Sequence, residues 1–180
     1  MKIALVGAEL EENLAIRYMH ASLFQAGHDV QIIPFNDVQQ VPQVVQHVAQ
    51  WQPALVGMSM VFTARAKEFI RLATAMRQAG FMGHITAGGH FATLHAELLL
   101  RDAPAIDSVL HGEGEEAMVD LAEHVHELQQ VQGMTCRRGQ GIVFTGPRVA
   151  VQNLDDRGGV EGHLKPGVCA DGNRHAKQGC

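Results

Sequence analysis

Aromatic residues are scarce in this chain of 180 residues, at 5% of the total, so the core must be built from aliphatic side chains. The net charge is −5 and no block of lysine or arginine stands out, which does not favour a nucleic-acid partner. No apolar run reaches membrane-spanning length, and residues 1–7 enter a strand pattern without a signal-peptide core. We therefore expect a cytoplasmic protein with no membrane partner.

Cysteines are few and scattered, at Cys136, Cys169 and Cys180, which indicates a reduced compartment and no disulfide framework. Two arginines follow Cys136, and positive charge lowers a thiol pKa. With no histidine partner evident, a nucleophilic role for Cys136 is still not expected. His90 and His111 have no cysteine or aspartate at zinc-ligand spacing, so the sequence predicts no metal site of protein ligands.

Short apolar segments alternate with amphipathic segments five times. The expected strands are residues 2–6, 29–33, 54–58, 84–87 and 106–110, and the expected helices are residues 14–26, 41–51, 64–79, 92–101 and 115–129. This alternation predicts an α/β fold with an open, doubly wound, parallel five-stranded sheet of the flavodoxin-like or Rossmann-like type.

The pattern changes after Gln130. Residues 134–138 and 142–145 flank a Gly-Gln-Gly turn and predict a small C-terminal β-hairpin. The sequence thus divides into an α/β domain over residues 1–130, an appended hairpin and linker over 131–156, and an irregular tail over 157–180. The tail is rich in glycine and polar residues, and we expect it to be disordered or aberrant.

Small side chains gather where the expected strands end. The candidate binding residues are Gly7, Ala8, Glu9, Ser59, Met60, Val61, Gly88, Gly89, His90, Gly112, Glu113 and Gly114. Ligands of such sheets bind outside the carboxyl ends of the strands, where glycine lets a large ligand approach the backbone. Turn geometry explains any one of these glycines, and helix capping would explain Ser59, but the whole set predicts a binding site.

Glu113 and Glu115 are not expected to be catalytic. Acidic residues near a helix start complement the helix dipole, so both glutamates have a structural explanation. No catalytic residue is predicted.

The residues from Ser59 to Gly89 resemble the S-x-L…G-G pattern of cobalamin-binding domains, with Val61 in place of the leucine. In that family the serine and the paired glycines border a deep channel for the dimethylbenzimidazole nucleotide tail, and the corrin lies over the strand ends. The resemblance therefore implies cobalamin as cofactor and partner.

A narrower resemblance covers roughly residues 1–156. The stretches "GMSMVF", "AGGHFATLHAE" and "IDSVLHGEGEEAMVDL", with the following hairpin, are similar to the cobalamin-binding front part of cobalamin-dependent radical S-adenosylmethionine enzymes. Their catalytic domain needs a C-x-x-x-C-x-x-C motif, which holds an iron–sulfur cluster. This chain has no such motif, so the cluster and S-adenosylmethionine belong to a domain that is absent here.

The loop after the first strand reads "GAELEENLAIR", where histidine-ligating cobalamin domains carry D-x-H-x-x-G. His20 falls within the following helix, too far along to reach cobalt. The resemblance therefore implies base-off cobalamin without a protein histidine ligand.

The expected function is that of a cobalamin-binding domain, the front of a methyltransferase-like or cyclase-like radical enzyme, which alone binds cofactor and catalyses nothing. Two alternatives remain. One is a flavodoxin-like domain that binds a flavin or nucleotide, although G-x-G-x-x-G is missing after the first strand. The other is a degenerate interaction module that binds nothing.

Overall fold

A computed structural model of the chain describes residues 1–10, 13–61, 63–139 and 141–148. The tail predicted over residues 157–180, and the linker from residue 149, lie outside the described residues. Residues 1–148 form one compact unit.

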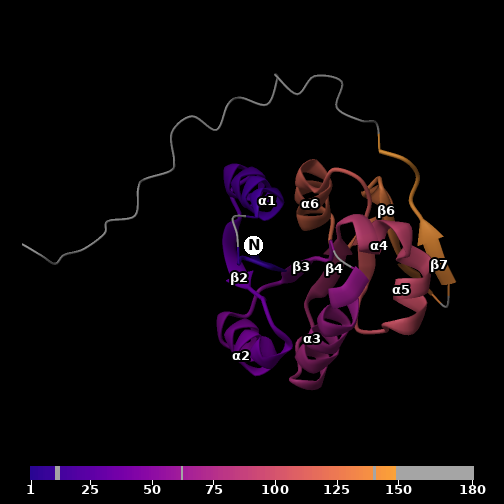
Figure 1. Cartoon of the computed structure of the whole chain (residues 1–180). Helices are drawn as coiled ribbons and strands as arrows, with labels where there is room; N and C mark the ends of the chain where they lie inside the picture. The colour runs from indigo at the N-terminus through magenta and orange to yellow at the C-terminus, as the bar shows by residue number, and fades with distance from the viewer. Residues whose placement is uncertain (11–12, 62, 140, 149–180) are drawn as a thin grey trace, which may run out of the picture. The chain divides into compact units, whose positions relative to one another are not determined.

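Strands and helices alternate through this unit as the sequence predicts (Figure 1). The strands are β1 (Lys2–Gly7), β2 (Asp29–Pro34), β3 (Leu55–Ser59), β4 (His84–Gly88), β5 (Ser108–Leu110), β6 (Met134–Arg138) and β7 (Gly141–Phe144). The α-helices are α1 (Leu14–Gln25), α2 (Val41–Trp51), α3 (Ala66–Gln78), α4 (His90–Leu94), α5 (Ala96–Asp102) and α6 (Gly114–Glu123). Short 3-10 helices are η1 (Val38–Gln40), η2 (Thr63–Arg65) and η3 (Leu128–Gln130).

Helix boundaries follow local signals. The Asn13 side chain accepts a hydrogen bond from the Ile16 N–H and caps α1, which ends before Gly27 at a positive φ of 83°. Pro42 lies in the first turn of α2, where its missing N–H costs little.

Two predicted helices differ from the structure. Residues 92–101 do not form one helix: α4 and α5 meet at His95, whose backbone (φ −121°, ψ 23°) leaves the helical region. The helix predicted to end at residue 129 ends at Glu123, and the chain then turns through η3 toward the buried Val131.

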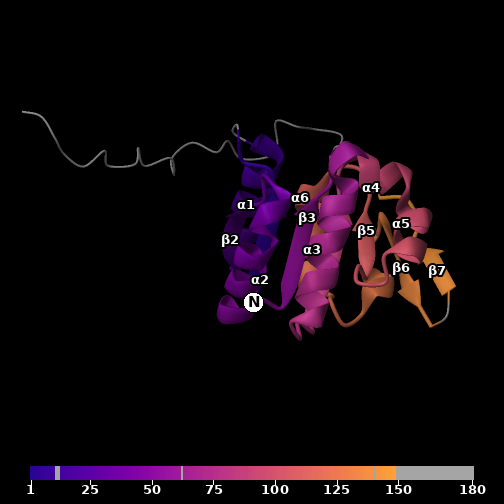
Figure 2. The ribbon, with the colours of Figure 1, turned by 60° about the horizontal axis from the view of Figure 1, so that its bottom comes forward.

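The sheet has the strand order β2-β1-β3-β4-β5-β6-β7. The first five strands are parallel, which confirms the predicted doubly wound sheet. The predicted hairpin is not merely appended: β6 pairs antiparallel with β5, and β7 with β6, so seven strands form one sheet (Figure 2). The strand order reverses between β1 and β3.

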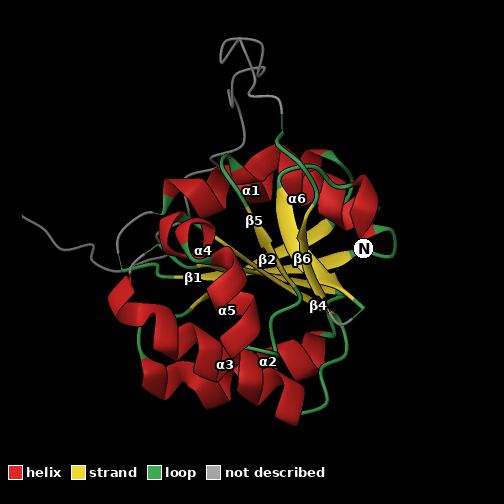
Figure 3. Ribbon diagram, turned by 90° about the vertical axis from the view of Figure 1, so that its right-hand side faces the viewer, coloured by secondary structure: helices red, strands yellow, loops and turns green. Residues whose placement is uncertain are grey.

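Helices cover both faces of the sheet (Figure 3). Helices α1 and α6 pack together on one face, and α2 and α3 pack together on the other. Each face has its own buried cluster. Ile3 and Leu5 of β1 point toward α1 and α6, whereas Ala4 and Val6 point toward α2 and α3, as the alternation of a strand requires.

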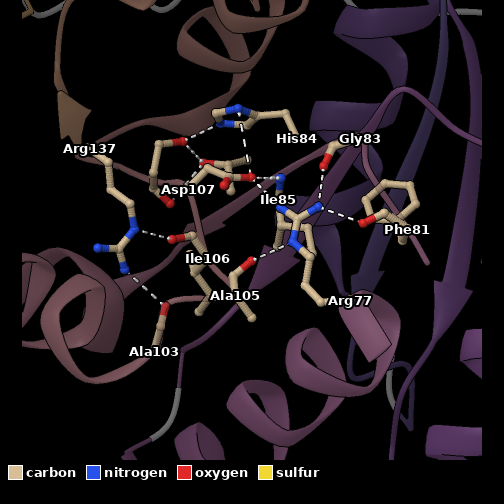
Figure 4. Close-up of polar contacts among 12 residues, drawn as sticks. Arg77, Phe81, Gly83, His84, Ile85, Ala103, Ala105, Ile106, Asp107 and Arg137 are labelled. Atoms are coloured by element: carbon tan, nitrogen blue, oxygen red, sulfur yellow. Dashed lines mark hydrogen bonds and ion pairs between the residues drawn. The ribbon is translucent and has the colours of Figure 1, made fainter. Parts of the chain in front are cut away.

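A polar cluster fixes the amino ends of β4 and β5 (Figure 4). The Asp107 carboxylate lies 2.5 Å from the Arg77 guanidinium and accepts a hydrogen bond from the Ile85 N–H. Arg77 also donates to the carbonyls of Phe81 and Gly83. Asp107 therefore joins α3 to two strands at the edge opposite the predicted site.

His84, whose side chain is 9% exposed, lies beside this cluster, and its Nε2 is 2.7 Å from the Ser108 hydroxyl oxygen. Burial lowers the pKa of His84; the nearby Asp107 carboxylate opposes this and the Arg77 charge reinforces it. The lowered pKa favours the neutral imidazole, which suits a structural contact with the Ser108 hydroxyl.

Candidate functional site

The carboxyl ends of β1, β3 and β4 lie side by side at the point where the strand order reverses. Ser59 pairs with Gly88 across β3 and β4, and the Met60 N–H donates to the Gly88 carbonyl at 2.7 Å. A Cβ on Gly7 would lie 3.2 Å from the Ser59 Cβ. Gly7, Ser59 and Gly88, from three separate segments, thus form one continuous edge, which we call the rim.

The paired glycines of the rim have different roles. A Cβ on Gly88 would meet no atom within 4 Å, so the space above it is open. Gly89 has a φ of 96° and a ψ of 172°, and its Cβ would lie 3.0 Å from the Met60 carbonyl. That conformation belongs essentially to glycine alone. Gly89 therefore shapes the turn into α4, and Gly88 leaves room for a ligand.

The neighbours of these residues are divided between core and surface. Met60 is fully buried among the side chains facing α2 and α3, so only its backbone borders the turn. Val61 is 37% exposed and His90 is exposed at the start of α4. Of the predicted residues in this segment, Val61 and His90 can present side chains to a ligand, whereas Met60 cannot do so without moving.

The loop after β1 is held by its own polar residues. The Asn13 side chain donates to the Ala8 carbonyl, and the Glu9 N–H donates to the Asn36 side chain at 2.7 Å. The Glu9 carboxylate pairs with Arg17 at 3.1 Å. Leu10, 79% exposed, is the most exposed of residues 8–10 and 13.

The loop after β5 is open at its first glycine. Gly112 has a φ of 69° and its Cβ would meet no atom within 4 Å. Glu113 caps α6 through its extended backbone, and a Cβ on Gly114 would lie 2.8 Å from the Met19 Cε. Gly112 resembles Gly88 in leaving space, whereas Gly114 accommodates α1.

His111, which follows β5, and Cys136 of β6 have pKa values shifted by burial. His111 lies 2.7 Å from the Thr135 hydroxyl and packs edge-on against Phe144, and burial lowers its pKa. Burial raises the pKa of the Cys136 thiol more than the Arg138 charge lowers it. In the described part of the chain, no three histidine, cysteine, aspartate or glutamate side chains are placed to hold a metal ion.

The sequence analysis did not identify the side chains that lie beneath the rim. On the face toward α1 and α6, a Cβ on Gly57 would lie 2.7 Å from the Met118 Cε, and a Cβ on Gly7 would lie 2.2 Å from the Ile16 Cδ1. The Met118 and Ile16 side chains fill the space below Ser59. A glycine in a strand interior, which marks a close approach, was the available signal at residue 57.

The geometry therefore offers an open, side-chain-poor rim, beneath which side chains of α1 and α6 fill the space against the sheet. The B12 binding domain family matches residues 3–122, which spans all five parallel strands. The chain belongs to the B12 binding domain family. It is a cobalamin-binding domain similar to the N-terminal part of cobalamin-dependent radical S-adenosylmethionine enzymes.

Known relatives extend well beyond this domain. An uncharacterized methyltransferase of Pyrococcus horikoshii is 27% identical over 155 residues, which are 79% of this chain and 32% of the relative. The anaerobic magnesium-protoporphyrin IX monomethyl ester cyclase of Synechocystis is 33% identical over 141 residues, 74% of this chain and 28% of the relative. The chain thus spans less than a third of these relatives.

A solved structure has the same fold. The radical S-adenosylmethionine methyltransferase TsrM from Kitasatospora setae, with cobalamin and an iron–sulfur cluster bound, superposes with a TM-score of 0.69 at 17% identity. The match covers 85% of this chain and 30% of TsrM. Among the described residues, no helix is both long and apolar enough to cross a membrane.

Proposed function

We propose that this domain holds the corrin of cobalamin over the rim, with the nucleotide tail entering between α1 and α6. The open space above Gly88, directly beside Ser59, is the observation that carries this proposal. A second open position, at Gly112, follows β5. Ligand contacts are proposed for Gly7, Ala8, Glu9, Ser59, Met60, Val61, Gly88, Gly89, His90, Gly112, Glu113 and Gly114, of which the fully buried Met60 would reach the ligand only after moving.

The protein supplies no histidine ligand to cobalt in this proposal. Residues 8–13 read Ala-Glu-Leu-Glu-Glu-Asn and contain no imidazole. Within this loop, Asn13 and Glu9 are engaged with the protein itself, at the Ala8 carbonyl and at Arg17. The base-off cofactor predicted from the sequence fits this loop.

The parent protein is proposed to be a radical S-adenosylmethionine methyltransferase or cyclase. Its further domain would hold the iron–sulfur cluster and S-adenosylmethionine, and the bound corrinoid would supply a carrier of methyl groups. The residues of this chain bind and orient the corrin, and the domain alone is expected to catalyse nothing. The cytoplasm remains the proposed compartment, supported by the scattered cysteines.

A visible spectrum tests the proposal. Purified protein is incubated with hydroxocobalamin, desalted and scanned, with Gly88→Leu as the matched variant. Corrin bands should remain with the wild-type protein and be lost with the variant. A colourless wild-type protein would refute the proposal, and flavin bands on the protein as purified would support the flavodoxin-like alternative.

A further inference from the structure

The two faces of the central strands differ in chemistry. Toward α2 and α3, β3 and β4 present a continuous apolar surface made by Val56, Met58, Ile85 and Ala87. Toward α1 and α6, β3 begins with the buried Leu55, but the positions nearer the rim are small or polar: Gly57, Ser59, Thr86 and Gly88. Both faces have a buried apolar core, but on the α1–α6 face the carboxyl ends of β3 and β4 contribute small or polar side chains, and side chains of the helices fill the space next to them.

Two methionine side chains lie on the α1–α6 side of the sheet. Met118 of α6 is 1% exposed, and its Cε lies where a Cβ of residue 57 would stand, at 2.7 Å. Met19 of α1 meets the position of a Gly114 Cβ at 2.8 Å. Both contacts are made by the terminal methyl of an unbranched side chain. We call Met19 and Met118 the methionine pair.

Methionine is suited to a space that must open. Its three rotatable bonds let the thioether leave a site at low cost, and its polarizable sulfur packs well against aromatic rings. An isoleucine in the same place would be held more firmly, because its β-branched carbon restricts χ1. The methionine pair therefore closes the interhelical space in the free protein without locking it.

We infer that Met118, assisted by Met19, is a displaceable plug of the nucleotide-tail channel and sets how tightly the domain prefers a complete cobalamin to a corrinoid without the tail. This inference rests on the proposed function. The nucleotide tail of cobalamin can occupy the space next to Gly57 only after the Met118 thioether has moved away. A corrinoid without the nucleotide contacts the rim alone. The cost of displacement is therefore paid only by ligands that carry the nucleotide.

The test compares two ligands on the same protein: hydroxocobalamin, and cobinamide, which has the corrin without the nucleotide. Dissociation constants are measured by spectroscopic titration. Met118→Ala should bind cobalamin about fivefold to tenfold more tightly, because no side chain has to leave the channel before the nucleotide tail can enter it. Gly57→Ala should bind cobalamin at least about tenfold more weakly, because its methyl takes tail space. Cobinamide affinity should change less than about twofold in both.

Met76→Ala is the matched control. Met76 of α3 is also fully buried, but it belongs to the core on the opposite face of the sheet, so it reports the effect of an equal core truncation there. It should leave the ratio of the two affinities unchanged. Circular dichroism verifies that each variant folds, and Gly57→Ala carries the test if Met118→Ala does not.

The outcomes separate the two proposals. A wild-type protein that binds neither corrinoid refutes the proposed function. A wild-type protein that binds both, with a cobalamin-to-cobinamide ratio unchanged by Met118→Ala or Gly57→Ala, leaves the proposed function standing and overturns the plug. Opposite shifts of that ratio in the two variants support it.

Discussion

Substitutions at the two neighbouring glycines of the rim should separate cofactor binding from stability. A Cβ at residue 88 meets no atom within 4 Å, and Gly88 has no positive φ. Gly88→Ala should therefore change the free energy of unfolding by less than about 0.5 kcal/mol. Gly88→Leu should also fold, because its side chain extends into the open space.

Gly89→Ala should destabilise the fold. Its backbone at φ 96° and ψ 172° costs a non-glycine residue about 1–3 kcal/mol, before the 3.0 Å contact of its Cβ with the Met60 carbonyl is counted. For a chain of this size, that free energy lowers the melting temperature by about 2–12 °C. Gly88→Ala and Gly89→Ala add the same methyl group at neighbouring positions.

The assay has two readouts on each variant: thermal unfolding without cofactor by circular dichroism, and cobalamin retained after desalting. Gly88→Leu should keep the melting temperature and lose the cofactor. Gly89→Ala should lose melting temperature. If Gly88→Leu retains cobalamin, or melts as low as Gly89→Ala, the assignment of open space to one glycine and backbone constraint to the other is wrong.

Three further predictions concern the rest of the domain. Asp107→Ala should lower the free energy of unfolding in urea by about 1–3 kcal/mol, because the Ile85 N–H loses its acceptor, whereas exposed Asp102→Ala should cost less than about 0.5 kcal/mol. Burial lowers the pKa of His84 and His111, so near pH 6 the unfolded chain binds protons more strongly than the folded chain does. The free energy of unfolding should therefore be highest above the ordinary histidine pKa of 6.5 and should fall as the pH drops below it. The fall should be shallower in His84→Gln. Cys136 should react with iodoacetamide at least about tenfold more slowly in the folded than in the urea-unfolded protein, measured by peptide mass, because burial raises its pKa; equal rates would contradict its placement.

Much of the fold follows from local signals in the sequence. The alternation of apolar and amphipathic segments gives the five parallel strands, and capping residues such as Asn13 and Gly27 fix helix ends. The break at His95 could not be predicted, because the apolar spacing continues across it. The docking of the hairpin onto β5 was also missed, since pairing partners are set by tertiary contacts rather than local pattern.

The candidate site was predictable as a set and less so residue by residue. Parallel strands bring their carboxyl ends to one edge, so Ser59 and Gly88 had to lie together once the sheet was known. The sequence gives no means to tell an open glycine from a constrained one, as at Gly88 and Gly89. That distinction depends on where the Met60 backbone runs.

The β6–β7 hairpin covers an edge of the sheet that would otherwise be open to pairing with another chain. β5 is only three residues long and would, without β6, present unpaired backbone groups beside the fully buried Val109. Pairing with β6 and β7 moves the outer boundary of the sheet to a strand whose residues are part-exposed, with arginines at 137 and 138 on the adjoining strand. Charge and short length near a sheet boundary discourage another chain from adding to it. A version cut back to residue 130 would therefore be expected to aggregate, even though every proposed cofactor contact lies before that point.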